Sequence, residues 1–395
     1  MPEDTDTGRG CGYVFLPVVL CDLDAAFLGF ELLRRPELRG RCVVVGGTPE
    51  QRGVVSTASY PARRFGVRSG MSTAAALRLC PEAVLLPVDM PYYHRMAERF
   101  HAVVAAGVAI WEPVGLDEVY LDLSGHRRTL PDTRAFCEDL RARVAAELGL
   151  SCSVAAAAGR ALAKVACEVL AKPGGVGLLP QQEAAAVLGP LPVGVLPGVG
   201  PATAATLARY GLRTCAQLVA APAEWLQRRL GAGAQTLQAL AGGTDHSRPQ
   251  PPGPARSLSV DQTFPSDLHA APDIQRAFSE LCWRLSQRLA AEGVWPRQLG
   301  VRWRTPDFAD HSRQRTFGGP LCTRQEVRQV ARRLWAEADV SRPVRLLSVQ
   351  AGLLVPRQPP LLPSARLEAT LGALEAQGVE IFPAALLGSA AGCRR

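Results

Sequence analysis

Lysine is almost missing from this chain of 395 residues, since 42 of its 44 basic side chains are arginine. The two lysines, Lys164 and Lys172, lie eight residues apart in the segment ALAKVACEVLAKPGG. The planar guanidinium of arginine and the compact ammonium of lysine are not interchangeable where one phosphate oxygen must be contacted. We therefore expect the two lysines to have a specific task. The alternative is an ordinary exposed helix on which two lysines have survived by chance.

The chain also lacks the patterns of several protein classes. It has no run of 18 apolar residues, and its acidic, Gly-rich first residues do not resemble a signal peptide. The 11 cysteines contain no C-x-x-C pair, so neither a zinc site nor a disulfide framework is indicated. These absences predict a protein of the reducing cytoplasm with no membrane contact.

Excess positive charge is missing from the first half of the chain. Residues 1–178 contain 20 basic and 20 acidic side chains, whereas residues 179–256 contain 6 and 3, and residues 257–356 contain 14 and 10. This division predicts chemistry in the first half and contact with a polyanion in the second. The alternative is that a basic composition has drifted onto loops.

Periodicity and turn residues predict an α+β sheet domain first, then short helices, then a second α+β domain. Residues 246–256 form a Pro-rich linker with little ability to pack, and a helix is expected at 272–291. The tail, residues 357–395, is expected to be partly disordered. The elements expected in the first domain are strands at 12–24, 41–46, 53–58, 115–124 and 151–158, and helices at 27–33, 72–80, 91–109 and 131–148.

Two acidic clusters lie beside apolar strands. Asp22 and Asp24 end the run VVLCDLD, and Asp117 and Glu118 are adjacent in GLDEVYLD. Burying an unpaired carboxylate costs several kcal/mol, and neighbouring residues of a strand reach one site only near a bend or strand end. Three hard oxygen ligands suit Mg²⁺ or Mn²⁺, and two such ions support in-line displacement at a triphosphate. Solvated caps at strand ends are the alternative.

A phosphatase is a second alternative for the first cluster. The run VVLCDLD is also how aspartyl-nucleophile phosphatases of the haloacid dehalogenase type begin. In those enzymes Gly-Thr usually follows the second aspartate, whereas Ala25 and Ala26 follow here. This alternative predicts hydrolysis of small phosphate esters without DNA.

Five stretches in this order resemble the Y-family translesion DNA polymerases, close to the bacterial DNA polymerase IV type, over about residues 14–356. They are DLDAAFLGFE (22–31), STASYPARRFGVRSGMS (56–72), GLDEVYLDLSG (115–125), SVAAAAGRALAKVACEVLAKPGG (153–175) and LPGVGPATAATLARYGL (196–212). The resemblance implies an α+β multidomain, right-hand polymerase. Its parts would be a ferredoxin-like palm (12–27 and 90–178), small fingers inserted in the palm (28–89), a helical thumb with a helix–hairpin–helix (179–245), the linker (246–256) and an α+β little finger (257–356).

The resemblance also implies roles for the acids. Asp22, Asp117 and Glu118 fall on the metal-binding catalytic acids, the backbone carbonyl of Leu23 on a further ligand, and Asp24 on a supporting acid. Two Mg²⁺ ions, which Mn²⁺ can replace, would serve transfer of nucleotides from dNTPs to a primer. Low fidelity without proofreading is expected, because the fingers insertion has few bulky aromatics and no separate exonuclease domain is visible.

Nucleotide and DNA contacts follow from the same resemblance. Phe27 matches the steric gate against a 2′-hydroxyl, and Lys164 matches a basic residue of the same helix as Lys172. The β- and γ-phosphates would be held by Tyr60, Arg63 and Lys172. The primer–template would contact the Gly-rich hairpin and the arginines that alternate on two strands of the little finger, which are Gly198, Val199, Gly200, Arg302, Arg304, Arg313 and Arg315.

Four residues depart from the family pattern, namely Ala26, Gly115, Gly159 and Arg160. Ala26 replaces an aromatic residue and would enlarge the nucleotide pocket. The alternative function is therefore a catalytically weak or inactive member of the family that binds primer–template DNA. We further expect a monomer associated with the nucleoid in the cytoplasm, with a sliding-clamp contact in the tail through RQPPLL (357–362) or VEIFPAALL (379–387).

Overall fold

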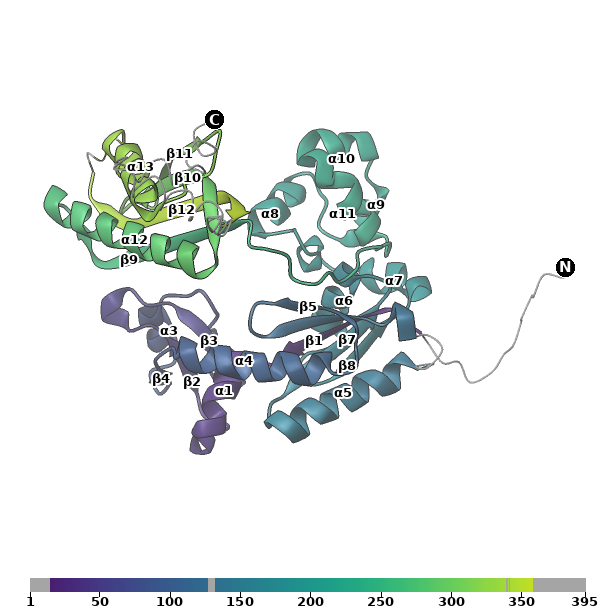
Figure 1. Cartoon of the computed structure of the whole chain (residues 1–395). Coiled ribbons are helices and arrows are strands. Elements are labelled where there is room, and N and C mark those ends of the chain that lie inside the picture. The colour runs from purple at the N-terminus through teal and green to yellow at the C-terminus, as the bar shows by residue number, and fades with distance from the viewer. Residues whose placement is uncertain (1–14, 127–131, 339, 341, 358–395) are drawn as a thin grey trace, which may run out of the picture. The chain divides into compact units, whose positions relative to one another are not determined.

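The structure, a computed structural model, describes residues 15–126, 132–338, 340 and 342–357. The start of the first predicted strand and, apart from Arg357, both predicted clamp segments lie outside these residues. The chain divides into two compact units, with the boundary after Pro252 and with Glu50–Arg52 grouped with the second unit (Figure 1). Each unit is described by itself.

The first unit is built on a five-stranded sheet with the order β5-β6-β1-β7-β8. Its central strand β1 (Val18–Leu23) is antiparallel to β6 (Glu118–Asp122) on one side and to β7 (Cys152–Ala157) on the other. The outer strands are β5 (Ile110–Val114), antiparallel to β6, and β8 (Val176–Leu179), parallel to β7. Neither β5 nor β8 was foreseen in the sequence.

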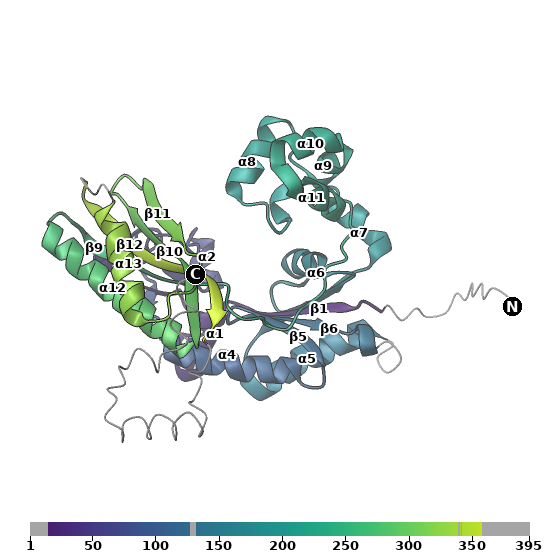
Figure 2. The same ribbon diagram turned by 45° about the horizontal axis from the view of Figure 1, so that its top comes forward.

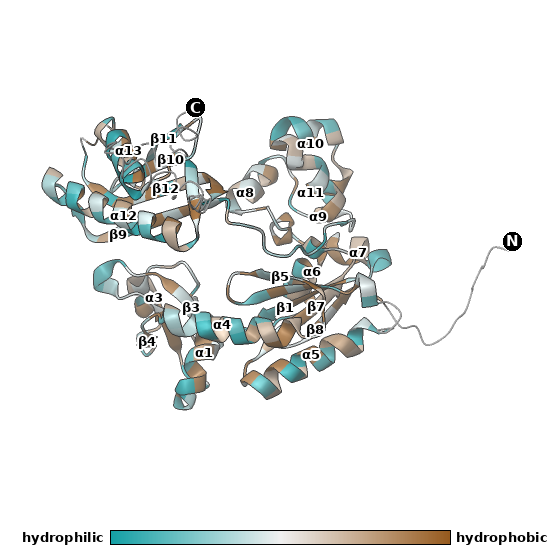
Figure 3. Cartoon of the chain, in the orientation of Figure 1, coloured by the Kyte–Doolittle hydropathy of each residue, from teal (hydrophilic) through white to brown (hydrophobic). Residues whose placement is uncertain are grey.

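Strand β1 is apolar along its length because both of its faces are covered. Val19 and Cys21 join a core with α4 (Met90–Ala105) and α5 (Thr133–Leu148), whereas Val18 and Leu20 join another with α6 (Arg160–Ala166). Figure 2 shows α4 and α5 under the sheet and α6 above it. In Figure 3 the strands of this sheet are largely brown, the colour of apolar residues. The predicted α+β sheet domain is confirmed.

The predicted insertion forms a smaller three-stranded sheet. The expected pairing of β2 (Val43–Gly46) with β3 (Val55–Ala58) is confirmed as antiparallel, and β4 (Val84–Leu86) adds a parallel neighbour to β2. Leu28 and Phe30 of α1 share one apolar core with α4 and α5, so the boundary predicted at residue 28 does not separate two cores. The other elements of this region are α1 (Ala26–Arg34), α2 (Tyr60–Arg64), α3 (Thr73–Leu79) and the 3₁₀ turns η1 (Pro36–Leu38), η2 (Pro49–Gln51) and η3 (Ser124–His126).

Short helices follow β8, as the Ala- and Leu-rich sequence predicts. Their apolar side chains belong to the same core as α6, so this helical region packs on the face of the sheet opposite α4 and α5. The elements are α7 (Gln181–Leu188), η5 (Val193–Val195), α8 (Pro201–Arg209), α9 (Cys215–Ala220), α10 (Ala223–Leu230), η6 (Gly231–Gly233) and α11 (Ala234–Ala241).

The first part of the predicted linker is held against the first unit rather than left unpacked. Helix α6 begins after Gly159, which has no side chain to cap it, and the Asp245 carboxylate accepts the Leu162 amide hydrogen at 2.9 Å instead. The Ser247 hydroxyl and carbonyl accept from the Arg160 amide, each at 3.1 Å. The departure at Gly159 has a steric reason, since a Cβ there would lie 2.3 Å from Asp245 Cγ.

The second unit is an antiparallel sheet with the order β11-β10-β12-β9. Helices α12 and α13 cover one face, where alternate residues of the strands are buried against them. The small α+β domain predicted here is confirmed, although β9 was not foreseen. Its elements are β9 (Ser257–Leu268), α12 (Ala271–Ala291), β10 (Val294–Arg304), β11 (Asp310–Thr316), α13 (Arg324–Ala336) and β12 (Val344–Pro356). Within the described residues, no helix of either unit has the length and apolar character needed to cross a membrane.

The contact between Gly159 and Asp245 predicts a cost for any side chain at residue 159. Gly159→Ala is expected to lower the free energy of unfolding by about 1–3 kcal/mol, because the new Cβ displaces the cap of α6. Thermal or urea unfolding of the full chain measures the change. Gly194→Ala is the matched control, since a Cβ there meets nothing within 4 Å. The prediction would be contradicted if the two variants had the same free energy of unfolding.

Candidate active site

The two acidic clusters meet at the end of the central strand. Asp22 pairs in register with Glu118 on the neighbouring strand β6, and the Leu23 amide donates to the Asp117 carbonyl at 2.9 Å. Asp117 precedes β6 by one residue, in a turn where Gly115 has a φ of +66°. This is the strand-end geometry that lets adjacent acids reach one site, and a positive φ is the physical reason for glycine at residue 115.

Asp24 is held by hydroxyl groups of β7 and of the residue before it. Its carboxylate accepts from the hydroxyls of Ser151 at 2.6 Å and Ser153 at 2.8 Å, and Ser153 Oγ accepts from the Gly174 amide at 2.9 Å. The next residue, Ala25, has a left-handed conformation and begins α1. Asp24 therefore fixes the start of the helix that carries Phe27, rather than adding a free carboxylate to the cluster.

The two lysines converge on Asp22, whose side chain is 4% exposed. Lys164 Nζ lies 2.8 Å from Asp22 Oδ2 and 2.8 Å from Glu118 Oε1, and Lys172 Nζ lies 3.1 Å from Asp22 Oδ2. Glu168, which the sequence analysis missed, bridges the lysines at 3.0 Å from Lys164 and 2.7 Å from Lys172. Both lysines thus contact one buried acid in this structure, which is a specific task and not that of an ordinary exposed helix.

A π-helical turn makes this convergence possible. Helix α6 continues into η4 (Cys167–Ala171), where the Lys172 amide donates to the Cys167 carbonyl at 3.0 Å. In a regular α-helix, side chains eight residues apart point about 80° apart. A π-helical turn contains one residue more than an α-helical turn. The side chains of Lys164 and Lys172 therefore reach the same atom, Asp22 Oδ2. The spacing of eight was the only sign of this turn in the sequence.

The electrostatics of the cluster favour a cation. Burial, and then the charges of Asp22 and Glu118, raise the pKa of Asp117. Burial opposes the charged form of Lys164, but Asp22 and Glu118 outweigh it and raise the lysine pKa above its usual range. In the same way, hydrogen bonds from Lys172 and Lys164 overcome burial and lower the pKa of Glu168. Negative charge is therefore only partly balanced by the lysines.

The donor set fits a hard divalent cation such as Mg²⁺, because carboxylate and carbonyl oxygens are its preferred ligands. Among the described residues, the groups of three ligand atoms that lie within 4.8 Å of one another do not include Asp22, Asp117 and Glu118 together. Lys164, between Asp22 and Glu118, accounts for part of this separation.

One cavity of about 400 Å³ gathers the predicted catalytic and nucleotide-binding residues. Arg63 comes to it from α2, with its guanidinium 5.0 Å from the ring centre of Tyr60 and its Nε donating to the Ala58 carbonyl. A neighbouring hollow of about 780 Å³ shares Tyr60 and Arg63 and adds Arg64 and Arg68. The predicted residues that line the first cavity are Asp22, Leu23, Phe27, Tyr60, Arg63, Asp117, Glu118, Lys164 and Lys172.

Phe27 is held in place by a buried aromatic and ionic contact. Its ring stacks on Tyr93 with centres 4.5 Å apart, and the Tyr93 hydroxyl donates to Glu31 Oε1 at 2.7 Å. Glu31 is fully buried and forms ion pairs with Arg34 and Arg35. The sequence analysis missed this support. Ala26 lines the same cavity although it is largely buried.

The predicted DNA-contact residues lie outside this cavity. In the hairpin, Gly198 has a φ of +91° and Gly200 precedes α8, and a Cβ at either would meet nothing within 4 Å. Backbone can therefore approach a ligand there, although the Val199 side chain is buried.

The four predicted arginines of the second unit do not share one face. Arg313 and Arg315 lie opposite Val301 and Leu299, which face the helices, so Arg302 and Arg304 lie on the other, helix-free face. Both of the latter are ion-paired, Arg302 with Asp261 at 3.2 Å and Arg304 with Asp310 at 2.6 Å. Each pair shares a face as predicted, but the pairs point in opposite directions.

Comparison with known proteins shows the family of this chain. Domain models described as the impB/mucB/samB family and its C-terminal domain match residues 21–168 and 255–362. DNA polymerase IV of Dehalococcoides mccartyi (strain CBDB1) is 36% identical over 314 residues, which cover 80% of both chains. DNA polymerase IV of Caulobacter vibrioides is 37% identical over 339 residues, 86% of this chain and 83% of its own.

Solved structures share the fold. A Y-family DNA polymerase chimera of Dbh and Dpo4 superposes with a TM-score of 0.78 at 22% identity, covering 86% of this chain and 99% of its own. DinB from Sulfolobus solfataricus gives a TM-score of 0.58 at 22% identity, covering 85% and 98%.

The raised pKa of Asp117 predicts an effect on stability. The folded protein binds the proton of the Asp117 carboxyl group more tightly than the unfolded chain does. The contribution of this group to the free energy of unfolding is therefore present at acid pH and is lost as pH rises through the folded pKa. Asp117→Asn is therefore expected to raise the free energy of unfolding at neutral pH in excess chelator, and the gain is expected to vanish below the pKa of an unfolded aspartate. Urea unfolding at both pH values measures it. Asp122→Asn, at the other end of β6, is the control.

The π-helical turn predicts unequal effects for a deletion and an insertion. Deletion of the exposed Val169 leaves the two lysines seven residues apart. In a regular helix this spacing puts them on one face, so the free energy of unfolding should change by less than about 1 kcal/mol. Insertion of alanine after Val169 should remove Lys172 from buried Asp22 and cost about 3 kcal/mol. Urea unfolding of both variants tests this, and equal losses would contradict it.

Proposed function

The chain belongs to the impB/mucB/samB family, the Y family of DNA polymerases, and we propose from this membership that it is a template-directed polymerase of the translesion type. It adds deoxynucleotides from dNTPs to the 3′ end of a primer. The observation that carries this function is the cavity in which the three acids, both lysines, Phe27 and the Tyr60–Arg63 pair lie together.

The parts of a right-hand polymerase are assigned by their elements. The five-stranded sheet with α4, α5 and α6 is the palm, because it carries the acids at the end of its central strand. The three-stranded sheet with α2 and α3 is the fingers, the helices α7 to α11 are the thumb, and the second unit is the little finger.

Asp22, Asp117, Glu118 and the Leu23 carbonyl are the proposed ligands of two Mg²⁺ ions, for which Mn²⁺ can substitute. When bound, such ions lower the pKa of the primer 3′-hydroxyl and neutralise charge on the triphosphate. Asp24 supports the site indirectly, through the serine hydroxyls that fix the start of α1.

The two lysines have different tasks at the triphosphate site. Tyr60, Arg63 and Lys172 bind its β- and γ-phosphates, with the ammonium of Lys172 exchanging Asp22 for a phosphate oxygen. Lys164 has two short contacts to acids and stays with them. Glu168 holds the two ammonium groups in position after one nucleotide has been added and before the next one binds.

Phe27 selects the sugar by exclusion. Its ring is held by Tyr93, which is anchored to Glu31, so that a 2′-hydroxyl cannot displace the ring without moving a buried, ion-paired carboxylate. Ala26 beside it leaves room for a distorted or damaged base pair, which agrees with low fidelity without proofreading.

DNA is held by the backbone and by arginines, without reading of sequence. The amides around Gly198, Val199 and Gly200 contact a primer–template phosphate in the thumb. On the little finger, Arg302 and Arg304 lie on the helix-free face of the sheet. Arg313 and Arg315 lie on the edge strand β11 and point to the opposite face. Binding is accordingly weakened by salt. A monomeric state, a nucleoid-associated cytoplasmic location and a clamp contact in the tail complete the proposal.

Primer extension on a short template tests the function. The wild type should extend with dNTPs in Mg²⁺ or Mn²⁺ and not in excess chelator, and Asp117→Ala/Glu118→Ala should abolish extension, whereas Asp122→Asn should not. Phe27→Ala should raise incorporation of rNTPs relative to dNTPs by roughly tenfold or more. Tight primer–template binding without extension would overturn the catalytic proposal and favour the inactive DNA-binding relative. Hydrolysis of small phosphate esters without DNA would favour the phosphatase.

A further inference from the structure

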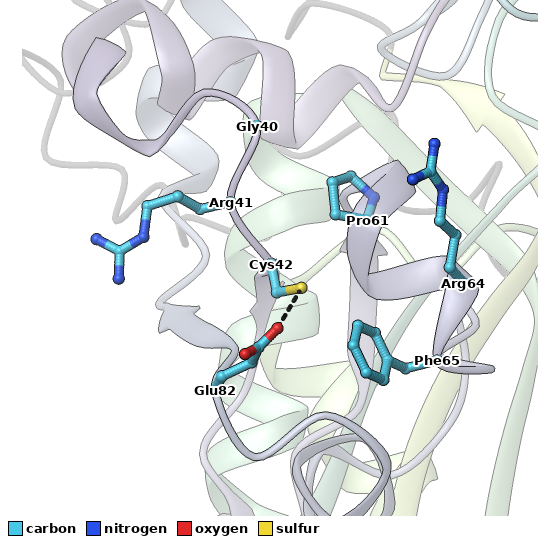
Figure 4. A pocket seen from close by; sticks show the side chains of 7 residues that line it. All are labelled: Gly40, Arg41, Cys42, Pro61, Arg64, Phe65 and Glu82. Carbon is cyan, nitrogen blue, oxygen red and sulfur yellow. Dashed lines mark hydrogen bonds between the residues drawn. The ribbon is translucent and has the colours of Figure 1, made fainter.

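Two cysteines and a glutamate gather in the fingers, outside the cavity of the active site. The Sγ atoms of Cys42 and Cys80 and a carboxylate oxygen of Glu82 all lie within 4.8 Å of one another. Cys42 Sγ lies 3.2 Å from Glu82 Oε1 (Figure 4). The proposed polymerase chemistry uses none of the three residues.

The backbone fixes all three positions. Cys42 immediately precedes β2, Cys80 ends α3, and Glu82 lies in the turn before β4, the parallel neighbour of β2. The Val84 amide donates to the Cys42 carbonyl at 2.9 Å, and the Ala83 amide donates to the Cys80 carbonyl at 3.1 Å. A donor set carried by paired strands and a helix end is organised before any ligand arrives.

The cluster borders a pocket that is open to solvent. Cys80 is fully buried, whereas Cys42 and Glu82 line a pocket of about 370 Å³ together with Pro61 and Phe65 of the α2 segment. Arg41 and Arg64 also line it, and Figure 4 shows both guanidinium groups turned away from the Cys42–Glu82 pair. Three protein donors with solvent on the fourth side is the arrangement of zinc sites that keep an open position.

We propose that Cys42, Cys80 and Glu82 bind a thiophilic divalent cation of the Zn²⁺ class, with a water molecule from the pocket as the fourth ligand. The two thiols release their protons to solvent as two metal–sulfur bonds and one metal–oxygen bond form, which leaves a net charge of −1 on the group. Arg41 and Arg64 at the rim of the pocket offset this charge.

Distances and chemistry agree with such a site. Metal–sulfur bonds of about 2.3 Å and metal–oxygen bonds of about 2.0–2.2 Å place tetrahedral ligand atoms about 3.5–3.8 Å apart. Cys42 Sγ and Glu82 Oε1 lie 3.2 Å apart, and all three ligand atoms lie within 4.8 Å of one another, so small side-chain movements reach this geometry. Soft sulfur ligands select Zn²⁺ over Mg²⁺, so this site and the oxygen-rich acidic site take different metals.

The proposal does not depend on polymerase activity. Its structural consequence is a bridge between the start of β2 and the end of α3, beside the α2 helix that carries Tyr60 and Arg63. Sequence spacing could not reveal it, because Cys42 and Cys80 are far apart in the chain and become neighbours only when β2 pairs with β4.

Titration with Cd²⁺, then displacement by Zn²⁺, tests the site on the full chain under reducing conditions. One equivalent should produce the ultraviolet thiolate-to-metal absorption, which carboxylates of the acidic site do not give. Cys42→Ser should weaken binding roughly a hundredfold and Glu82→Gln roughly tenfold. Cys282→Ser, in the second unit, is the matched control and should bind as the wild type does.

A second readout guards against variants that fail to fold. Zn²⁺ should raise the thermal midpoint of the wild type and of Cys282→Ser but not that of Cys42→Ser, because a ligand stabilises only the state that binds it. Circular dichroism establishes that each variant is folded. The proposal would be overturned if the wild type showed no thiolate-to-metal absorption. It would also be overturned if the folded Cys42→Ser and Glu82→Gln variants bound the metal as tightly as the wild type does.

Discussion

The structure of the first unit depends on one buried carboxylate. Asp22 ends a strand whose two faces belong to two different apolar cores, and its side chain is almost completely removed from water. Such a charge is tolerated only with partners, and the two lysines of the chain are those partners. The π-helical turn, Glu168 and the register of β6 against β1 all place charge around this residue. The contacts around Asp22 are therefore in place in the absence of a ligand, with Lys164 between two of the acids.

The arrangement separates two kinds of residue around the reacting groups. Acids come from the sheet, where backbone pairing fixes their register, and cations come from helices, Lys164 from α6 on one face of this sheet and Arg63 from α2. The ring of Phe27 is supported in a third way, by Tyr93, whose hydroxyl donates to the buried carboxylate of Glu31. The cavity thus combines side chains that are fixed by contacts on several elements with the small side chain of Ala26.

The sequence predicted what short-range patterns encode. The central strand, the acids at its end, the hairpin of the fingers and the Gly-rich turn before α8 follow from alternation, turn residues and motif order. Strands β5, β8 and β9 were not predicted because each is defined by its pairing with another strand (β6, β7 and β12, respectively) and not by its own residue pattern. The helix expected to reach residue 109 ends at Ala105. The supports of the site, Glu31, Tyr93 and Glu168, were missed for the same reason. Each has a role only through a contact made after folding, and the opposite faces of the two arginine pairs depend on the register of β10 with β11.

The capping of α6 by Asp245 also sets the length of the connection between the two units. Residues up to Gln250, whose amide donates to Glu112, are fixed to the first unit, which leaves only PPGPAR before β9 begins. A Pro-rich segment of this kind is semi-rigid and extends about 3.1 Å per residue, so it spans roughly 20 Å. The three prolines of this segment restrict the backbone conformations that are open to the connection.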